Sequence, residues 1–384
     1  MTTAGELLQL VRHGGSPSRS ELSRETGLSR TAVNARLSAL EDLGLVVPGD
    51  ELASTGGRPA GGVAFNPAAG VVLAAAVGRS RSQVGVLDLA GEELVASSAE
   101  HAVGASPDDV MPQVADRLAK HLADLGSPPV HGTGVSLPGT VDPVRGVSID
   151  SPAMPGWDGV DLAAYLRQPG PVYVANDADV LARSERLGHA ATYRDLVVVK
   201  ASTGLGLGII AEGRVVAGHL GAAGEIGHTK VDAAAGRRCR CGDVGCLETI
   251  AGGWALVAEL QEAGHRVEHV RDLAALAVAG DADAKRHLRE AGRRLGEVLA
   301  VAINLLNPQA VVLGGDMAAA FDAYAAGVRE SVYARAAALA TRDLRLLAST
   351  YGDRAGLVGC AAMALDHVLS PAAVDARLAE LARG

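Results

Sequence analysis

Soft metal ligands and carboxylates gather in one short, glycine-rich stretch of the chain, Gly224 to Glu248. Three of the four cysteines, Cys239, Cys241 and Cys246, fall within this stretch, and His228 is the nearest histidine upstream. Zinc favours closed, four-coordinate sites of thiolate and imidazole ligands, and a Cys3His set is a common structural form. The alternative is three unrelated thiols, which clustering in a glycine-rich loop disfavours. The stretch therefore predicts a zinc site formed by His228, Cys239, Cys241 and Cys246.

The composition limits the classes of protein to which this stretch can belong. The chain has 384 residues, a net charge of −9 and only 3% aromatic residues, so its cores must be built from Ala, Val and Leu. An acidic chain does not coat nucleic acid with its whole surface, but a small DNA-reading module is compatible with this charge. No apolar run reaches the roughly 18–20 residues of a membrane helix, and no signal peptide is visible. We therefore expect a cytoplasmic protein with no membrane partner, whose cysteines bind metal rather than form disulfides.

The first sixty residues have the pattern of two helices joined by a glycine turn. Ser18 to Thr26 predicts the first helix, Gly27 the turn, and Ser29 the N-cap of the second helix. One face of that second helix is apolar at helical spacing, through Val33, Leu37 and Leu40. The other side carries residue types that reach base edges and phosphates in a major groove: Ser29, Arg30, Thr31, Asn34 and Arg36.

The segment that follows, from Val47 to Pro59, predicts a wing hairpin whose tail carries Arg58. The whole segment resembles a winged helix-turn-helix DNA-binding domain. The alternative is a small helical protein-interaction module, and six arginines against seven acidic residues in positions 1–60 give it some support. Four of the six arginines, Arg19, Arg24, Arg30 and Arg36, lie in these two helices. This distribution and the fold pattern favour DNA binding.

The rest of the chain alternates β-branched or small apolar runs with amphipathic helices, which predicts an α/β domain. The expected strands are 71–77, 83–88, 93–98, 130–137, 171–175, 196–200 and 310–313, and the expected helices include 107–125, 178–187 and 284–307. Asn176 and Asp177 follow the strand 171–175 directly. Polar groups at the carboxyl ends of strands lie where open α/β sheets bind ligands.

Several of these pieces together resemble the ROK family, which comprises repressors, open reading frames and sugar kinases. The motifs that carry the resemblance are Ser136 to Gly139, Asn176-Asp177, Thr203 to Gly208, Gly224 to Glu248 and Leu313 to Gly315. The resemblance extends from about Val71 to the C-terminus. It implies a duplicated actin/hexokinase-like, ribonuclease H-like α/β fold, here preceded by the winged helix-turn-helix. We expect a DNA-binding domain over residues 1–62 and a ROK domain over 63–384, with lobes at roughly 68–180 and 190–384.

The resemblance also implies roles for individual residues. The four metal ligands match the family's zinc ligands, and its sugar contacts fall on Gly139, Asn176, Asp177, Glu225, His228 and Glu248. Carboxylates and an amide suit vicinal hydroxyls, because they accept and donate several hydrogen bonds at once. His228 can serve both sites, with one ring nitrogen on the metal and the other facing the sugar. The alternative for Glu225 and Glu248 is solvent exposure in a polar loop.

The same resemblance raises the question of kinase activity. A ROK kinase would use Asp177 as its base, and an Asp and a Gly-Gly-Thr turn at the first strand would hold magnesium and the ATP phosphates. Here those positions fall on Ala76 and Arg79, which cannot serve in this way. The glycine motifs Thr203 to Gly208 and Leu313 to Gly315 remain, and either could persist because glycine turns need φ > 0.

We therefore predict a sugar-responsive transcriptional regulator, a repressor, which binds operator DNA as a homodimer or homotetramer and carries a structural zinc ion. It is predicted not to be an enzyme. One alternative is a bifunctional sugar kinase that also binds DNA. Another is a DNA-binding protein whose second domain is only a dimerisation scaffold.

Overall fold

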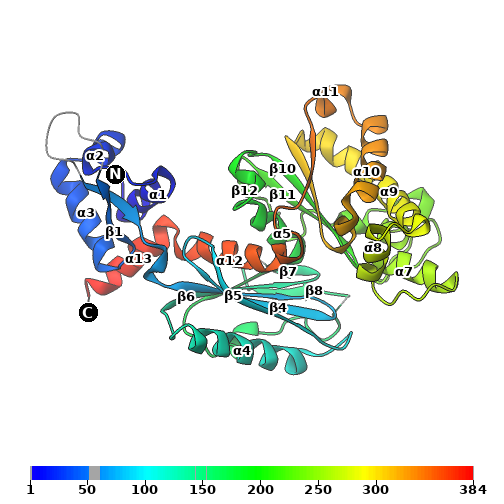
Figure 1. The fold of residues 1–384 in the computed structure, drawn as a ribbon, viewed down its shortest axis with the longest axis horizontal. Helices are drawn as coiled ribbons and strands as arrows, with labels where there is room; N and C mark the ends of the chain where they lie inside the picture. The colour runs from blue at the N-terminus through cyan, green and yellow to red at the C-terminus, as the bar shows by residue number, and fades with distance from the viewer. Residues whose placement is uncertain (1, 52–60, 143, 153, 384) are drawn as a thin grey trace.

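The computed structural model describes residues 2–51, 61–142, 144–152 and 154–383. Three units follow one another in Figure 1: a small helical unit at the N-terminus and two lobes, each built on a five-stranded sheet. This is the mixed α/β architecture predicted from the sequence, with the helix-turn-helix ahead of a duplicated α/β domain.

The N-terminal unit consists of three helices and a two-stranded ribbon: α1 (Ala4–Gly14), α2 (Arg19–Thr26), α3 (Arg30–Asp42), β1 (Val46–Glu51) and β2 (Gly61–Phe65). Gly27 ends α2 in the left-handed region, with φ of 70°, and Ser29 caps α3 by accepting from the Ala32 N–H, as predicted. β1 and β2 pair antiparallel and form the predicted wing. Because β2 continues to Phe65, the wing extends three residues beyond the predicted boundary at residue 62. Arg58 lies outside the described residues.

The first lobe is a sheet with the strand order β5-β4-β3-β6-β9. Its strands are β3 (Val71–Val77), β4 (Arg81–Asp88), β5 (Glu93–Glu100), β6 (Val130–Leu137) and β9 (Val172–Asn176), and a hairpin of β7 (Thr140–Asp142) and β8 (Val147–Asp150) follows β6. Successive side chains of β3 point to opposite faces of the sheet. Leu73 and Ala75 pack beneath α4 (Pro107–Asp124), whereas Val72 and Ala74 pack against α12 (Ala355–Val368). Helices on both faces explain why β3 is apolar at nearly every position.

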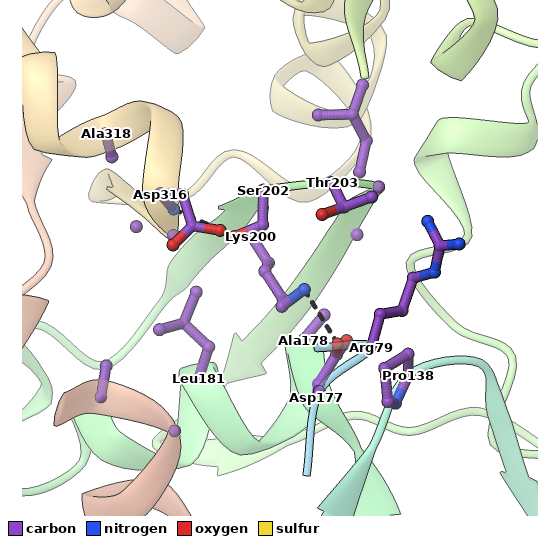
Figure 2. Close-up of a pocket in the computed structure, with 18 of the residues that line it drawn as sticks. Arg79, Pro138, Asp177, Ala178, Leu181, Lys200, Ser202, Thr203, Asp316 and Ala318 are labelled. Atoms are coloured by element: carbon purple, nitrogen blue, oxygen red, sulfur yellow. Dashed lines mark hydrogen bonds and ion pairs between the residues drawn. The ribbon is translucent and has the colours of Figure 1, made fainter. Parts of the chain in front are cut away.

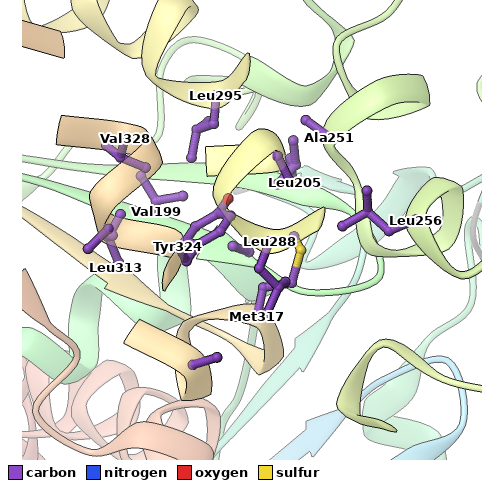
Figure 3. Close-up of a cluster of buried hydrophobic side chains, with 14 of the residues drawn as sticks. Val199, Leu205, Ala251, Leu256, Leu288, Leu295, Leu313, Met317, Tyr324 and Val328 are labelled. Carbon is purple, nitrogen blue, oxygen red and sulfur yellow. The ribbon is translucent and has the colours of Figure 1, made fainter. Parts of the chain in front are cut away.

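The second lobe repeats this plan with the strand order β12-β11-β10-β13-β14. Its strands are β10 (Leu196–Ala201), β11 (Leu205–Ala211), β12 (Arg214–Val215), β13 (Ala310–Gly314) and β14 (Arg345–Ala348). The long helix α9 (Ala282–Leu306) and α10 (Phe321–Arg335) cover one face, where Leu288, Leu295 and Val328 meet Val199 and Leu313 (Figure 3). Shorter helices complete this side: α6 (Glu248–Ala251), α7 (Gly253–Glu262), α8 (Val270–Val278) and α11 (Ala338–Thr341).

Two helices lie between the sheets, and each packs on the sheet that it does not directly follow in the chain. α5 (Asp177–Glu185) follows β9 of the first sheet, yet its Leu181 and Ala182 pack with Val198 and Val312 of the second sheet. α12 follows β14 of the second sheet but packs on β3 and β6 of the first. α5 belongs with the second sheet and α12 with the first, because each helix buries its apolar face on the sheet that it does not directly follow.

The C-terminal helix α13 (Pro371–Leu381) joins the N-terminal unit to the first lobe (Figure 1). The Gly5 N–H on α1 donates to Asp375 Oδ1 at 2.9 Å, and the Gln9 side chain donates to the Leu369 carbonyl. Glycine is required at position 5, because a Cβ there would lie 2.3 Å from the Pro371 oxygen. A single apolar cluster runs from α1 through α13 to α12, so the DNA-binding unit and the first lobe share a core.

Within the described residues, no single helix is long and apolar enough to cross a bilayer. One bent pair, Gly352–Val368 with Pro371–Leu381, passes the same test of length and composition when the two are taken together. Most residues of α12 in this pair are buried in the core of the protein.

Candidate functional site

The four predicted metal ligands meet in one cluster. One ligand atom from each of His228, Cys239, Cys241 and Cys246 lies within 4.8 Å of all the others. His228 Nδ1 is 3.7 Å from Cys239 Sγ, and Cys241 Sγ is 3.7 Å from Cys246 Sγ. A 3-10 turn at Ile226–His228 places the histidine, and a narrow antiparallel loop returns the cysteines to it. The predicted grouping is confirmed.

The donor set and its spacing fit zinc. Ligands bound tetrahedrally at the usual zinc–sulfur distance lie about 3.8 Å apart, close to the separations in this cluster. Burial raises the pKa of the Cys239 thiol to about 12, so a thiolate here calls for a cation beside it. Lys230 Nζ donates to Cys246 Sγ at 3.0 Å, which stabilises negative charge on the Cys246 thiolate. Because four protein ligands leave no open position, a zinc ion held here would serve as a cross-link.

His228 connects this cluster to a second polar group. While Nδ1 faces the sulfur atoms, Nε2 lies 3.9 Å from Glu225 Oε2. Glu225 in turn accepts a hydrogen bond from the Thr140 hydroxyl of β7, at 3.3 Å. Ligation at one ring nitrogen orients the other. The cluster can therefore hold the imidazole in a fixed direction toward the space between the lobes.

That space is a cleft of about 890 Å³ lined by residues of both lobes. A cleft of this volume is at the upper end of the range of small-molecule sites. The structure brings all six predicted sugar contacts to it: Gly139, Asn176, Asp177, Glu225, His228 and Glu248. Figure 2 shows part of its lining, in which Pro138 of the first lobe and Asp177 at the start of α5 lie near Lys200 and Thr203 of the second lobe.

Asn176 and Asp177 stand where β9 ends and α5 begins. Asn176 Oδ1 accepts from the Ala178 N–H at 2.7 Å, and Asn176 Nδ2 donates to the Gly139 carbonyl at 2.6 Å. The amide therefore caps α5 and holds the Gly139 turn, whose φ of 92° suits glycine. Asp177 occupies the first turn of α5, where the helix dipole favours a carboxylate.

Lys200 is the main group in the cleft that the sequence analysis missed. Its Nζ lies 2.8 Å from Asp177 Oδ2, so an ion pair connects β10 of the second sheet to the start of α5 (Figure 2). A signal was present in the sequence. Lys200 is the one charged residue in the otherwise apolar strand Leu196–Ala201.

Glu248 is buried, with 8% of its surface exposed, which contradicts the alternative of a solvated loop residue. Its Oε2 accepts from the Leu205 N–H and its Oε1 from Trp254 Nε1, both at 2.9 Å. The guanidinium of Arg240 stacks over the Trp254 ring at 4.5 Å. The carboxylate is thus held in one orientation at the cleft, and Trp254 and Arg240 are further cleft residues that the sequence analysis did not identify.

Two of the motifs that raised the question of kinase activity lie beside the cleft, one at the end of β3 and one in β11. Ala76 and Arg79 line the cleft at the end of β3, as expected from the count along the chain. In β11, a Cβ on Gly206 would lie 2.7 Å from the Ala178 Cβ, and one on Gly208 would lie 2.5 Å from the Ala182 Cβ. Neither glycine has positive φ. The expectation that positive φ preserves this motif is therefore wrong, and close packing of α5 on the sheet explains it instead.

The predicted DNA-contact residues do not all lie together. Ser29, Arg30, Thr31 and Asn34 are exposed at the N-terminal half of α3. Arg36 is only half-exposed and faces α1, since its Nε donates to the Thr2 carbonyl at 2.8 Å. Four of the five described residues are thus exposed near the start of α3, and Arg36 is not.

Sequence and structural comparisons agree with this geometry. The ROK family pattern matches residues 72–367, and a winged helix-turn-helix DNA-binding pattern matches residues 3–47. The chain belongs to the ROK family. The xylose repressor of Bacillus spizizenii is 27% identical over 368 residues, with 94% of each chain covered. A ROK family transcriptional regulator described as a homolog of the Escherichia coli MLC protein superposes with a TM-score of 0.81 at 27% identity, covering 98% of each chain.

An enzyme shares the ROK part of the fold. The ROK family glucokinase of Streptomyces griseus, solved with glucose and AMPPNP, superposes with a TM-score of 0.65 at 26% identity. It covers 77% of this chain and 99% of its own. The kinase therefore matches about three quarters of this chain, whereas the regulator matches nearly all of it.

Proposed function

We propose that this protein is a transcriptional repressor whose binding to operator DNA is controlled by a sugar in the interlobe cleft. The winged helix-turn-helix and the similarity to a xylose repressor along nearly the whole chain support this proposal. The proposed sugar contacts are the six that line the cleft: Gly139, Asn176, Asp177, Glu225, His228 and Glu248. Acidic and amide side chains from both lobes suit a polyhydroxylated ligand, which can hydrogen-bond to both at once.

The observation that carries the proposal is a continuous packing route from the cleft to the DNA-binding unit. α5 begins in the cleft at Asp177 and packs against α12, where a Cβ on Gly359 would lie 1.9 Å from the Val180 oxygen. α13 follows α12, and α1 of the DNA-binding unit is hydrogen-bonded to α13 through Asp375. A movement of α5 relative to the first sheet would therefore reach α1 through packed helices. Such a route can couple two sites when the ligand binds two arrangements with different affinity.

In this proposal, the DNA-binding unit comprises the chain through Phe65, and the ROK domain comprises the remainder. Ser29, Arg30, Thr31 and Asn34 read or contact DNA from the start of α3, and Arg58 is a further proposed DNA contact. Arg36 supports this surface by tying α3 to the start of α1. The protein acts in the cytoplasm as a homodimer or homotetramer, because two-fold related units match a palindromic operator. The zinc is structural and stiffens the loop that carries Glu225 and His228.

The test uses the full-length protein and a DNA fragment from its own promoter. Neutral sugars and their phosphates are screened by thermal shift, and operator affinity is then measured by fluorescence anisotropy with and without each hit. We expect one sugar to raise the melting temperature and to weaken operator binding. Glu225→Gln should abolish this response, while the exposed and remote Glu262→Gln serves as the matched control. A protein that binds its operator but ignores every sugar in both assays would overturn the proposal.

A sugar kinase that also binds DNA is the second candidate, favoured only by the likeness to the glucokinase. Phosphoryl transfer relies on positioned cations and phosphate-binding turns, and Ala76 and Arg79 cannot supply them. Incubation with ATP, magnesium and hexoses should give no ADP above background. Turnover that disappears in Asp177→Asn would favour the kinase instead.

A further inference from the structure

Lys200 is an unusual residue for its place in the fold. It emerges from β10, whose residues from Leu196 to Val199 are fully buried. In the sheet it lies between Gly206 of β11 and Gly314 of β13, which have no side chains to crowd it. α5 approaches closely over both glycines, because a Cβ on Gly314 would lie 3.0 Å from Leu181. The lysine stem therefore passes beside α5 and delivers its ammonium to the floor of the cleft.

The ammonium meets one carboxylate directly and two at longer range. Asp177 is its ion-pair partner at 2.8 Å, with both side chains mostly buried at 24% and 20% exposure. Burial works against the charge of Lys200, yet the attraction of Asp177, reinforced by Asp316 and Glu248, outweighs it and raises the pKa of the lysine. A mostly buried ammonium with such a partner stays charged, and removing either member would leave the other without its counter-ion.

This pair presents a donor and an acceptor side by side. Lys200 keeps further N–H groups, and Asp177 keeps Oδ1, for hydrogen bonds to a third group. A sugar hydroxyl satisfies both, since it accepts from the ammonium and donates to the carboxylate. A phosphate ester at that position would bring like charge against Asp177, and a deoxy carbon would leave both groups without a ligand partner.

We propose that Lys200 is a specificity-determining residue of the ligand site, which together with Asp177 selects a free hydroxyl on the sugar over a phosphorylated or deoxygenated position. This inference rests on the proposed function and narrows its ligand class to sugars that are unmodified where they meet the pair. The same ion pair opposes a role for Asp177 as a base, because taking up a proton would break its pairing with the ammonium. Lys200 thus distinguishes a binding cleft from a phosphoryl-transfer site.

The test compares wild type with Lys200→Met and Lys200→Arg by isothermal titration. The probes are neutral pentoses, hexoses and N-acetylhexosamines, their phosphates, and monodeoxy analogues of the sugar that binds tightest. In wild type, we expect the free sugar to bind at least about tenfold more tightly than its phosphate and than one of the deoxy analogues. In Lys200→Met that deoxy penalty should disappear, and Lys200→Arg should recover part of it. A purely structural role for Lys200 would lower all affinities together and leave the penalty unchanged.

Each other outcome has a distinct meaning. If a phosphate binds more tightly than its parent sugar in wild type, or if Lys200→Met keeps the same deoxy penalty, the inference is overturned while the proposed function stands. If no sugar of either class binds, the proposed function fails and the inference with it. Should Lys200→Met fold poorly, as judged by zinc content and melting temperature, the wild-type comparison of sugar, phosphate and deoxy analogues still decides the question.

Discussion

The two walls of the cleft are built in different ways. On the second-lobe wall, His228 is held through the metal cluster and Glu248 through Leu205 and Trp254. On the first-lobe wall, Ala76 and Arg79 line the cleft at the positions where the family resemblance predicts magnesium and phosphate contacts in a kinase, and the Arg79 side chain extends into the cleft (Figure 2). The polar groups of the second-lobe wall are therefore held in place by further contacts, whereas the turn after β3 on the first-lobe wall carries Ala76 and Arg79. This difference is one reason why we propose a ligand-binding cleft rather than a site of phosphoryl transfer.

Loss of the metal cross-link should have the largest effect, because it removes the contacts that hold the second-lobe wall. Cys246→Ser removes one of four ligands, and we expect the zinc content to fall well below one ion per chain. The free energy of unfolding should drop on the order of 4 kcal/mol, since a structural metal contributes directly to folding. Sugar affinity should fall as well, because the second-lobe wall loosens. Zinc content is measured by mass spectrometry and stability by denaturation.

The matched control is Cys360→Ala, which changes a buried cysteine that lies outside the cluster. It should leave the zinc content unchanged. If Cys246→Ser retained both zinc and sugar affinity, the cluster would have no part in holding this wall.

Disrupting the packing of α5 on the second sheet should have the second-largest effect on stability. Gly208→Val places a side chain against Ala178 and Ala182, where even a Cβ would be 2.5 Å from its neighbour. We expect a loss of about 3 kcal/mol of unfolding free energy, as for other overpacked cores. Arg79→Gly, at the turn of the opposite wall, should change stability by less than about 0.5 kcal/mol. Equal losses in the two variants would remove the asymmetry between the walls.

A buried carboxylate on α5 should make stability depend on pH. Burial raises the pKa of Asp179 to about 7, with Asp177 and Glu225 adding to the rise and Arg183 opposing it. Because the folded pKa lies above the ordinary value, the native state holds the proton more tightly, and stability is lost as pH rises from about 4 to 7. Asp179→Asn should remove this slope and stabilise the protein by about 2 kcal/mol at pH 8.

Urea denaturation at pH 5 and pH 8 measures this effect. The exposed Asp322→Asn is the control and should follow wild type at both values. A slope that survives in Asp179→Asn would assign the pH dependence to another group.

The smallest expected effect concerns the route to DNA. Asp375→Ala removes the acceptor of the Gly5 N–H between α13 and α1, a loss of about 1 kcal/mol. Sugar affinity should stay unchanged, while the factor by which sugar weakens operator binding should fall several-fold. Glu380→Ala, an exposed change on the same helix, should leave that factor intact. A normal factor in Asp375→Ala would mean that the signal does not pass through this contact.

Features encoded in one short segment could be predicted from the sequence, and features that depend on tertiary pairing could not. The metal ligands lie close together in the chain, and the N-cap at Ser29 and the apolar face of α3 follow local rules. The Lys200–Asp177 pair joins a strand of one sheet to a helix that follows the other. The exchange of α5 and α12 between the sheets leaves no mark in their periodicity, because either sheet would bury the same apolar face. The turn of Arg36 toward α1 also depends on how α3 docks.

Thermodynamic linkage gives the most direct test of sugar-controlled DNA binding. The sugar affinity is measured by isothermal titration for the free protein and for the protein saturated with operator. Reciprocity requires that DNA weaken sugar binding by the same factor by which sugar weakens DNA binding, about 5–150-fold for typical coupling. We predict equal factors in the two directions. An identical sugar affinity with and without operator would contradict the account, because a ligand without differential affinity cannot control repression.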